Sequence, residues 1–297
     1  MIYAIETVTR GSAYYEGLKS LWCKTFGDSP EFVDAFYDCF GNDIQGYVTL
    51  DQDGDVCSAL TCYLAGAYEG RLVYVSYAIC TREDFRGQGL ASALTAYVKE
   101  EVVLRGGISL VSPAEKSLEE FYAGLGYDPI FHASPRAVLA ESFEDELDEF
   151  EFDEDDDIED IVRPEAEIKR IDASLYNKYR EAYLAEITHI VPGDEMLSAA
   201  ELSGEGFYTI NGGDAVCCIT EKKRGQLILS ELLISPVLLD LSGEIDVEVA
   251  QLLAKHFDAV EVVYKLPGAG QVQSMAAGFF DRGDDGTPLH YFGFPIE

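Results

Sequence analysis

The chain has 297 residues, enough for two domains of ordinary size, and 47% of them are hydrophobic, which is sufficient for packed cores. Lys and Arg number 21 against 55 Asp and Glu, and the net charge of −34 excludes a broad basic surface for nucleic acid or for an anionic membrane. No apolar run reaches the roughly 20 residues that a bilayer span requires. We therefore expect neither a nucleic-acid partner nor a membrane partner.

The cysteines and histidines indicate a reducing compartment and no metal. The seven cysteines include no Cys-x-x-Cys pair, and the start of the sequence shows no pattern typical of a signal peptide. Such usage predicts free thiols and a cytoplasmic location. The four histidines are scattered singly, without the spacing of metal ligands, so we expect no metal site.

In chain order, residues 1–140 alternate between strand and helix patterns, which predicts a mixed α/β domain. Strands are predicted at residues 2–6, 46–50, 56–64, 71–80, 108–111 and 136–140. Helices are predicted at residues 14–26, 31–40, 89–104 and 118–125. The sequence Asp53-Gly54-Asp55 predicts the turn between the second and third strands.

An acidic block follows this first part. Residues 141–160 include 14 Asp or Glu, and a run that repels itself in this way resists packing into a core. We interpret residues 141–162 as an interdomain linker.

After the block the order of elements recurs. Strands are predicted at residues 168–171, 206–210, 213–217, 227–234 and 260–264, and helices at residues 174–185 and 247–257. The sequence Gly206-Phe207-Tyr208-Thr209-Ile210 is similar to Gly46-Tyr47-Val48-Thr49-Leu50. The sequence therefore predicts two similar mixed α/β domains, at residues 1–140 and 163–297.

The most informative segment joins the strand at 71–80 to the helix at 89–104. It contains Arg86-Gly87-Gln88-Gly89-Leu90-Ala91, with two glycines just before the helix. Glycines let the backbone approach a ligand closely, and a helix N-terminus offers free N–H groups and the positive end of its dipole. The turn is suited to a pyrophosphate even in an acidic protein, because backbone amides are the donors. A tight loop without a ligand would show the same pattern.

The pattern Arg86-x-x-Gly89-x-Ala91 resembles the acyl-CoA pyrophosphate motif of the GNAT (GCN5-related) N-acetyltransferases. The residues 77–81 before it and the sequence Phe121-Tyr122-Ala123-Gly124-Leu125-Gly126-Tyr127 after it resemble further motifs of that family, in the same order. The resemblance covers about residues 1–140 and implies a central mixed β-sheet flanked by helices. The motif does not recur after residue 234, so we interpret residues 163–297 as a degenerate GNAT-like domain. This plan is similar to the first two domains of Eis-type acetyltransferases.

The resemblance also implies a set of site residues for the co-substrate acetyl-CoA. The backbone amides that would cradle its pyrophosphate are those of Arg86, Gly87, Gln88, Gly89, Leu90 and Ala91. The backbone of Ile79 and Cys80 would pair with its pantetheine arm.

Tyr122 matches the general acid of the family, which protonates the departing thiolate. Its other possible role is packing between a helix and the sheet. The general base is not identified, and many members have Asn where this chain has Ser112-Pro113. Four acidic residues remain candidates for the base: Glu69, Glu83, Asp84 and Glu119.

We therefore expect an acetyl-CoA-dependent N-acetyltransferase that transfers acetyl directly to an amine of a small molecule or a protein. The alternative is a non-catalytic protein that binds or senses acyl-CoA on the same fold. The class of acceptor and the oligomeric state stay open.

Overall fold

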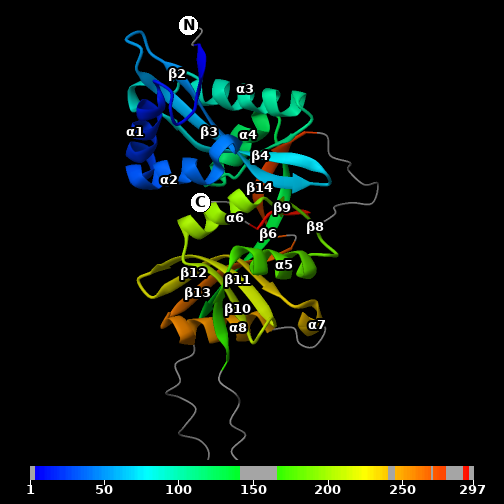
Figure 1. Cartoon of the computed structure of the whole chain (residues 1–297). Coiled ribbons are helices and arrows are strands. Elements are labelled where there is room, and N and C mark those ends of the chain that lie inside the picture. The colour runs from blue at the N-terminus through cyan, green and yellow to red at the C-terminus, as the bar shows by residue number, and fades with distance from the viewer. Residues whose placement is uncertain (1–3, 141–165, 240–244, 269, 279–289, 294–297) are drawn as a thin grey trace, which may run out of the picture. The chain divides into compact units, whose positions relative to one another are not determined.

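The computed structural model describes residues 4–140, 166–239, 245–268, 270–278 and 290–293 (Figure 1). These residues group into two compact units. The first unit includes residues up to Ser134 together with two later segments, Leu184–Ser203 and Pro267–Glu297. The second unit consists of Pro135–Tyr183 and Gly204–Leu266. The acidic block predicted as a linker lies outside the described residues.

The first unit is built around one mixed sheet. Its strands run in the order β1-β2-β3-β4-β5-β14-β6. Their bounds are β1 Ile5–Val8, β2 Ile44–Leu50, β3 Val56–Tyr68, β4 Arg71–Thr81, β5 Ile108–Val111, β14 Gln271–Ala277 and β6 Asp128–Leu139, of which the residues after Ser134 belong to the second unit. The first four strands are antiparallel neighbours, whereas β4 and β5 are parallel.

The helices of the first unit are α1 Tyr15–Phe26, α2 Pro30–Phe40, α3 Leu90–Leu104, α4 Ser117–Gly124 and α6 Asp194–Ser203, with 3₁₀ turns η1 Gly41–Asp43 and η2 Glu83–Phe85. Local sequence sets several ends. The α1 helix stops at Gly27, which adopts a φ of 86°. The Ser29 hydroxyl accepts the N–H of Phe32 and Pro30 opens α2, a typical N-terminal cap.

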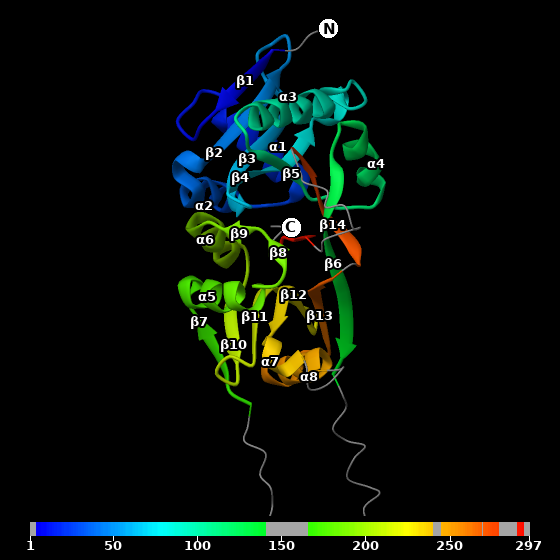
Figure 2. The same ribbon diagram turned by 90° about the vertical axis from the view of Figure 1, so that its right-hand side faces the viewer.

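Alternation along β3 assigns the helices to the two faces of this sheet. Leu60 and Cys62 pack in a cluster with Leu94 and Val98 of α3. The neighbouring odd-numbered side chains contact the opposite layer, where Tyr63 lies against Phe36 of α2 with ring centroids 5.6 Å apart. One face therefore carries α3 and the other carries α1 and α2, as Figure 2 shows.

Segments from the far end of the sequence complete the first unit. Strand β14 inserts between β5 and β6, and is antiparallel to both. The short β9 (Val191–Pro192) pairs with the end of β3, where Gly66 lies opposite Pro192. A Cβ at Gly66 would come 2.0 Å from the Val191 carbonyl oxygen, so glycine is required there. Two further short strands are β8 Thr188–His189 and β15 His290–Tyr291.

The second unit repeats the strand order of the first. Its strands lie across the sheet in the order β7-β10-β11-β12-β13. Their bounds are β7 Ile168–Ile171, β10 Gly206–Ile210, β11 Ala215–Lys223, β12 Gln226–Ile234 and β13 Glu261–Pro267. The first three pairings are antiparallel and β12–β13 is parallel. Its helices are α5 Ala173–Tyr183, α7 Pro236–Leu239 and α8 Ile245–Phe257. A core of aliphatic side chains from β11, β12 and α8 holds it together.

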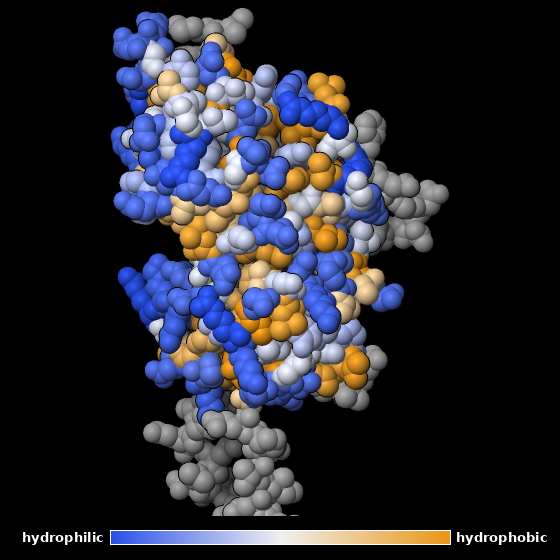
Figure 3. Space-filling view, viewed as in Figure 1, coloured by the Kyte–Doolittle hydropathy of each residue, from blue (hydrophilic) through white to orange (hydrophobic). Residues whose placement is uncertain are grey.

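The predicted mixed α/β fold and the repeated order of elements agree with the structure. The sequence analysis placed the last strand of the first half at 136–140, whereas β6 already begins at Asp128. It gave no prediction for α6, β8, β9, β14 or β15. Hydrophilic residues cover much of the visible face of each unit, with apolar patches between them (Figure 3).

Candidate active site

The first unit opens where strands β4 and β5 cease to pair. Their parallel register covers only Val73↔Ile108 to Val75↔Leu110, while β4 continues to Thr81. On the other side of β4 the register with β3 shifts between Ala59↔Cys80 and Thr61↔Tyr77. Within this bulge Ala78 has a φ of 48°, in the left-handed region. A bulge bends a strand locally, and here it lies where the two parallel strands part.

Backbone directions at the end of β4 distinguish Ile79 from Cys80. The Cys80 carbonyl accepts the Ser58 hydroxyl at 2.9 Å, and the Arg82 N–H donates to the Cys57 carbonyl at 2.9 Å, so both face β3. Because successive residues of a strand direct their backbone groups to opposite sides, those of Ile79 face the opening toward β5. Cys80, which was expected to share this role, directs its carbonyl toward β3 instead.

The glycine turn lies directly after β4. Gly87 and Gly89 adopt φ angles of 74° and 78°, and a Cβ at either would meet nothing within 4 Å. Gly89 precedes the first residue of α3, and no side chain caps this end of the helix. The first-turn amides of Leu90 and Ala91 therefore lack an intrahelical acceptor and suit an anion.

Arg86 has a different role from the glycines. Its N–H donates to the Glu83 carbonyl at 3.3 Å, and its guanidinium Nε donates to the Thr81 carbonyl at 3.2 Å. Both bonds close the turn on itself. Arg86 therefore shapes the loop that presents the glycines.

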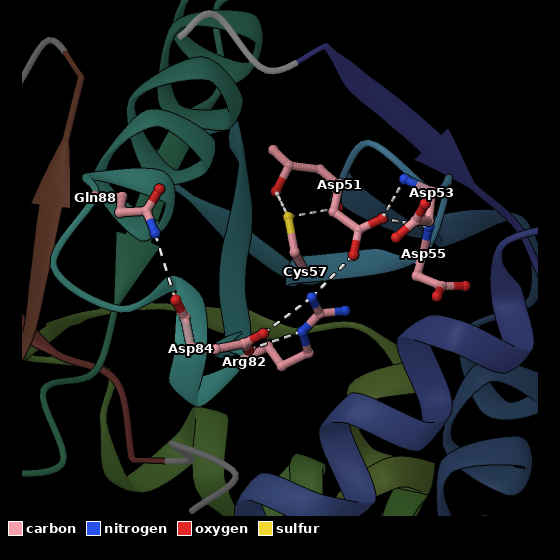
Figure 4. Close-up of polar contacts among 8 residues, drawn as sticks. Asp51, Asp53, Asp55, Cys57, Arg82, Asp84 and Gln88 are labelled. Atoms are coloured by element: carbon pink, nitrogen blue, oxygen red, sulfur yellow. Dashed lines mark hydrogen bonds and ion pairs between the residues drawn. The ribbon is translucent and has the colours of Figure 1, made fainter.

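A network of charged side chains anchors this turn to the β2–β3 hairpin (Figure 4). Arg82 donates to Asp51 at 2.9 Å and to Asp84 at 2.8 Å. Asp51 also accepts the N–H groups of Asp53 and Asp55, and the Asp55 bond is the largest cause of its lowered pKa. The Gln88 side chain donates to the Asp84 carbonyl at 3.5 Å. The hairpin thus holds the segment that leads into the glycine turn.

The ion pair between Arg82 and Asp84 affects one of the candidate general bases. Arg82 beside Asp84 lowers the pKa of that carboxyl. A carboxylate with a lowered pKa is a poorer proton acceptor, so this ion pair disfavours Asp84 as the general base.

Tyr122 projects from α4 into a cluster with Val111, Tyr127, Met275 and Ala277. The residue is 7% exposed, and burial raises the pKa of its phenol above 10. Three members of this cluster, Val272, Met275 and Ala277, come from β14, so a segment distant in sequence completes the surroundings of this tyrosine.

The comparisons with known proteins agree with this geometry. The model of the acetyltransferase (GNAT) family matches residues 11–127. Residues 11–127 are a GNAT acetyltransferase domain. This GNAT domain contains the opening between β4 and β5, the glycine turn and Tyr122. No curated protein sequence matches the chain.

Solved structures extend the likeness in fold beyond the GNAT domain. A GCN5-related N-acetyltransferase from Anabaena variabilis has a TM-score of 0.63 at 14% identity, covering 92% of this chain and 72% of its own. A probable N-acyltransferase from Enterococcus faecalis has a TM-score of 0.62 at 13% identity, covering 93% and 72%. A tandem GNAT protein from the clavulanic acid biosynthesis pathway has a TM-score of 0.53 at 12% identity, covering 94% and 100%.

The residue that follows β5 in the GNAT domain is tied to the inserted strand. The Ser112 hydroxyl lies 2.7 Å from the Ser274 hydroxyl of β14. Ser112 stands where many members of the family have Asn, and no sequence pattern connects it with β14. No local sequence pattern predicts this hydrogen-bonded pair, because its two serines are 162 positions apart in the sequence.

The corresponding place in the second unit has another composition. After β12 the chain passes through Ser235 to Pro236, the first residue of α7, so no glycine pair precedes this helix. On β12, Glu231 is fully buried and accepts hydrogen bonds from Arg180 at 3.1 Å and from Tyr176 at 2.5 Å, both on α5.

The described residues also bear on two other classes of function, metal binding and membrane insertion. Among the described residues no group of His, Cys, Asp and Glu could hold a metal ion. None of the helices in the described ranges is long and apolar enough to cross a bilayer.

Proposed function

We propose that the protein is an acetyl-CoA-dependent N-acetyltransferase whose catalytic site lies in the first unit. The observation that carries the proposal is the open glycine turn at the start of α3, next to the place where β4 and β5 part. The names of the similar structures, an N-acetyltransferase and a probable N-acyltransferase, support the same class of reaction.

The turn would bind the pyrophosphate of acetyl-CoA through backbone amides. The groups available for this are the N–H donors of Gly87, Gln88, Gly89, Leu90 and Ala91. Fixed amide donors at a helix N-terminus attract an anion without a basic side chain, which suits a protein with a net charge of −34. The acetyl-pantetheine arm would then extend along Ile79 into the opening between β4 and β5. An N–H there would polarise the thioester carbonyl as negative charge develops on its oxygen.

The reaction would be a direct transfer. The neutral amine attacks the thioester carbon, the C–N bond forms and the C–S bond breaks, and the sulfur leaves with the electron pair. Tyr122 would give the leaving sulfur its proton, because a phenol with a raised pKa stays protonated at neutral pH. The proton that the attacking nitrogen loses would pass to a general base, directly or through water, so that the products are the acetylated amine and the CoA thiol. Burial raises the pKa of the Cys80 thiol to about 12, which disfavours a covalent acyl-cysteine route.

The acceptor would be an amine of a small molecule or of a protein, and the acidic surface would favour the approach of cationic amines. We also propose a reducing, cytoplasmic location, which is supported by the seven unpaired cysteines.

The test is calorimetric titration of the full chain with acetyl-CoA. We expect one site per chain, because the Arg/Gln-x-x-Gly-x-Gly/Ala motif does not recur in the sequence after β12. Gly89→Trp should abolish measurable binding, since its side chain would occupy the turn. Val237→Trp, at an exposed position on α7 of the second unit, is the matched control and should bind as the wild type does.

The outcomes separate the proposals. Two sites per chain would contradict the assignment of a single acetyl-CoA site. Tight binding retained by Gly89→Trp would contradict the role of the turn. A single site without acetyl transfer to any of a panel of amines would favour a protein that senses acyl-CoA.

A further inference from the structure

Gln273 of β14 has a buried side chain without a partner. The residue is 8% exposed, and both its amide nitrogen and its amide oxygen are buried without a hydrogen bond to the described residues. Burying a polar atom without a partner carries a free-energy penalty, and native structures rarely retain such atoms without a reason. A carboxamide in which both ends are unsatisfied therefore indicates a binding group for a ligand.

The place of Gln273 in the sheet links it to the candidate active site. In the pairing of β14 with β6, Val272 lies opposite His132 and Ser274 opposite Phe131, so Gln273 is the extra residue of a bulge. Bulges redirect side chains and are common beside active sites. The pairing of β14 with β5 ends at Met275↔Val111.

The neighbours of Gln273 in sequence surround the same region. Ser274 bonds Ser112, the residue that follows β5. Val272 and Met275, on either side, pack in the cluster that contains Tyr122. Gln273 thus lies on the inserted strand just beyond the end of β5, at the level where β4 and β5 have already parted.

The chemistry of the unsatisfied atoms restricts the ligand. An ammonium group only donates and would leave the amide nitrogen of Gln273 unsatisfied. A carboxylate or a phosphate only accepts and would leave the amide oxygen unsatisfied. A secondary amide has one donor and one acceptor in a planar arrangement that matches a carboxamide.

We propose that Gln273 binds a secondary amide of the reacting complex through both ends of its side chain. This inference rests on the proposed function. Two sources have this chemistry, namely the pantetheine arm of acetyl-CoA and a peptide-like acceptor. The side chain of Gln273 would serve substrate binding, since its amide forms no hydrogen bond with the described residues of the free protein.

The test uses Gln273→Met, which keeps the length of the side chain but removes donor and acceptor, and Gln271→Met as the matched control at an exposed position of the same strand. Each full-length protein is titrated with acetyl-CoA, with adenosine 3′,5′-bisphosphate, which lacks pantetheine, and, in the presence of CoA, with the tripeptide trialanine amide. Thermal unfolding of the free proteins is measured in parallel.

We expect Gln273→Met to unfold at the same temperature as the wild type or higher, because it removes unsatisfied polar atoms from the interior. It should weaken one of the amide-containing ligands by about 10-fold or more and leave adenosine 3′,5′-bisphosphate unaffected. Weaker acetyl-CoA binding identifies pantetheine as the source of the amide. Unchanged acetyl-CoA binding with weaker peptide binding identifies the acceptor.

Two results would overturn the inference. A clear fall in the unfolding temperature of Gln273→Met would show that the carboxamide is satisfied within the protein. Unchanged affinity for acetyl-CoA and for the peptide would show that it binds neither. A wild-type protein that fails to bind acetyl-CoA would instead refute the proposed function, so the two failures are distinguishable.

Discussion

The two units share the order and direction of their first five strands, and an instructive difference lies at the end of the fourth strand of each. In both, the parallel pairing covers three residues, Val73–Val75 of β4 and Gln226–Ile228 of β12. Beyond it the first unit has a bulge with a left-handed Ala78 and an open glycine turn. Beyond it the second unit has a buried ion pair and a proline-initiated helix. This difference rests on few residues, while the order and direction of the first five strands are common to both units.

The contact between the first helix and the fourth strand also differs between the two units. In the first unit, Trp22 of α1 lies against Tyr77 of β4 with ring centroids 5.4 Å apart. In the second, Arg180 of α5 binds Glu231 of β12, and both are fully buried. The stability of β12 at Glu231 therefore depends on the buried ion pair with Arg180 of α5.

The largest effect is expected from breaking that ion pair. Arg180→Met should lower the free energy of unfolding by about 3–5 kcal/mol, because it leaves the Glu231 carboxylate buried without its charged partner. Urea or thermal unfolding measures the loss. The double variant Arg180→Met/Glu231→Leu should recover most of it, since no buried charge remains. A double variant as unstable as the single one would mean that the lost packing, and not the charge, is responsible.

The second effect concerns catalysis in the first unit alone. Tyr122→Phe should lower the turnover number for acetyl transfer by about 100-fold while leaving the dissociation constant of acetyl-CoA unchanged. Steady-state kinetics and calorimetry measure the two quantities separately. The matched control is Tyr264→Phe in the second unit, where the phenol donates to Asp246 at 2.7 Å, and there turnover should not change. Equal turnover in Tyr122→Phe and the wild type would assign Tyr122 to packing.

The smallest effect is expected from the partly exposed ion pairs that Arg82 forms with Asp51 and Asp84. Arg82→Gln should shift the unfolding temperature by less than about 2 °C, because ion pairs that water still reaches contribute little to stability. It should nevertheless weaken acetyl-CoA binding, since Arg82 holds the segment before the glycine turn to Asp51. If Arg82→Gln lost much stability and kept its affinity for acetyl-CoA, Arg82 would stabilise the fold as the buried Arg180 does, and the prediction would be wrong.

Sequence patterns predicted those parts of the molecule whose signals are local. The hairpin at Asp53-Gly54-Asp55, helices α1 and α3 and the glycine turn each depend on neighbouring residues, and the structure has each at or near its predicted position. Strand β9 is two residues long and exists through its pairing with the distant Gly66. No short-range periodicity indicates such an element.

The candidate site was also predictable only where its signal is local. The turn at Gly87 and Gly89 follows from the motif. Gln273 and Ser274 lie in a stretch with few β-branched residues, within the residues that the sequence assigns to the second domain. Their relevance depends on the insertion of β14 between β5 and β6, which sequence spacing does not reveal. Helix α6 does have a local signal, an acidic first turn after Gly193 with apolar residues spaced along one face, although the predicted helices do not include it.

The insertion of β14 has a consequence for folding during synthesis on the ribosome. The GNAT domain ends at residue 127 by its family match, yet its sheet needs residues 271–277. Until the last part of the chain has emerged, β5 presents an unpaired edge with the sequence Ile-Ser-Leu-Val, and such edges invite wrong pairing between chains. Contacts this distant in sequence also slow folding. The N-terminal half is made first, but its sheet is completed last.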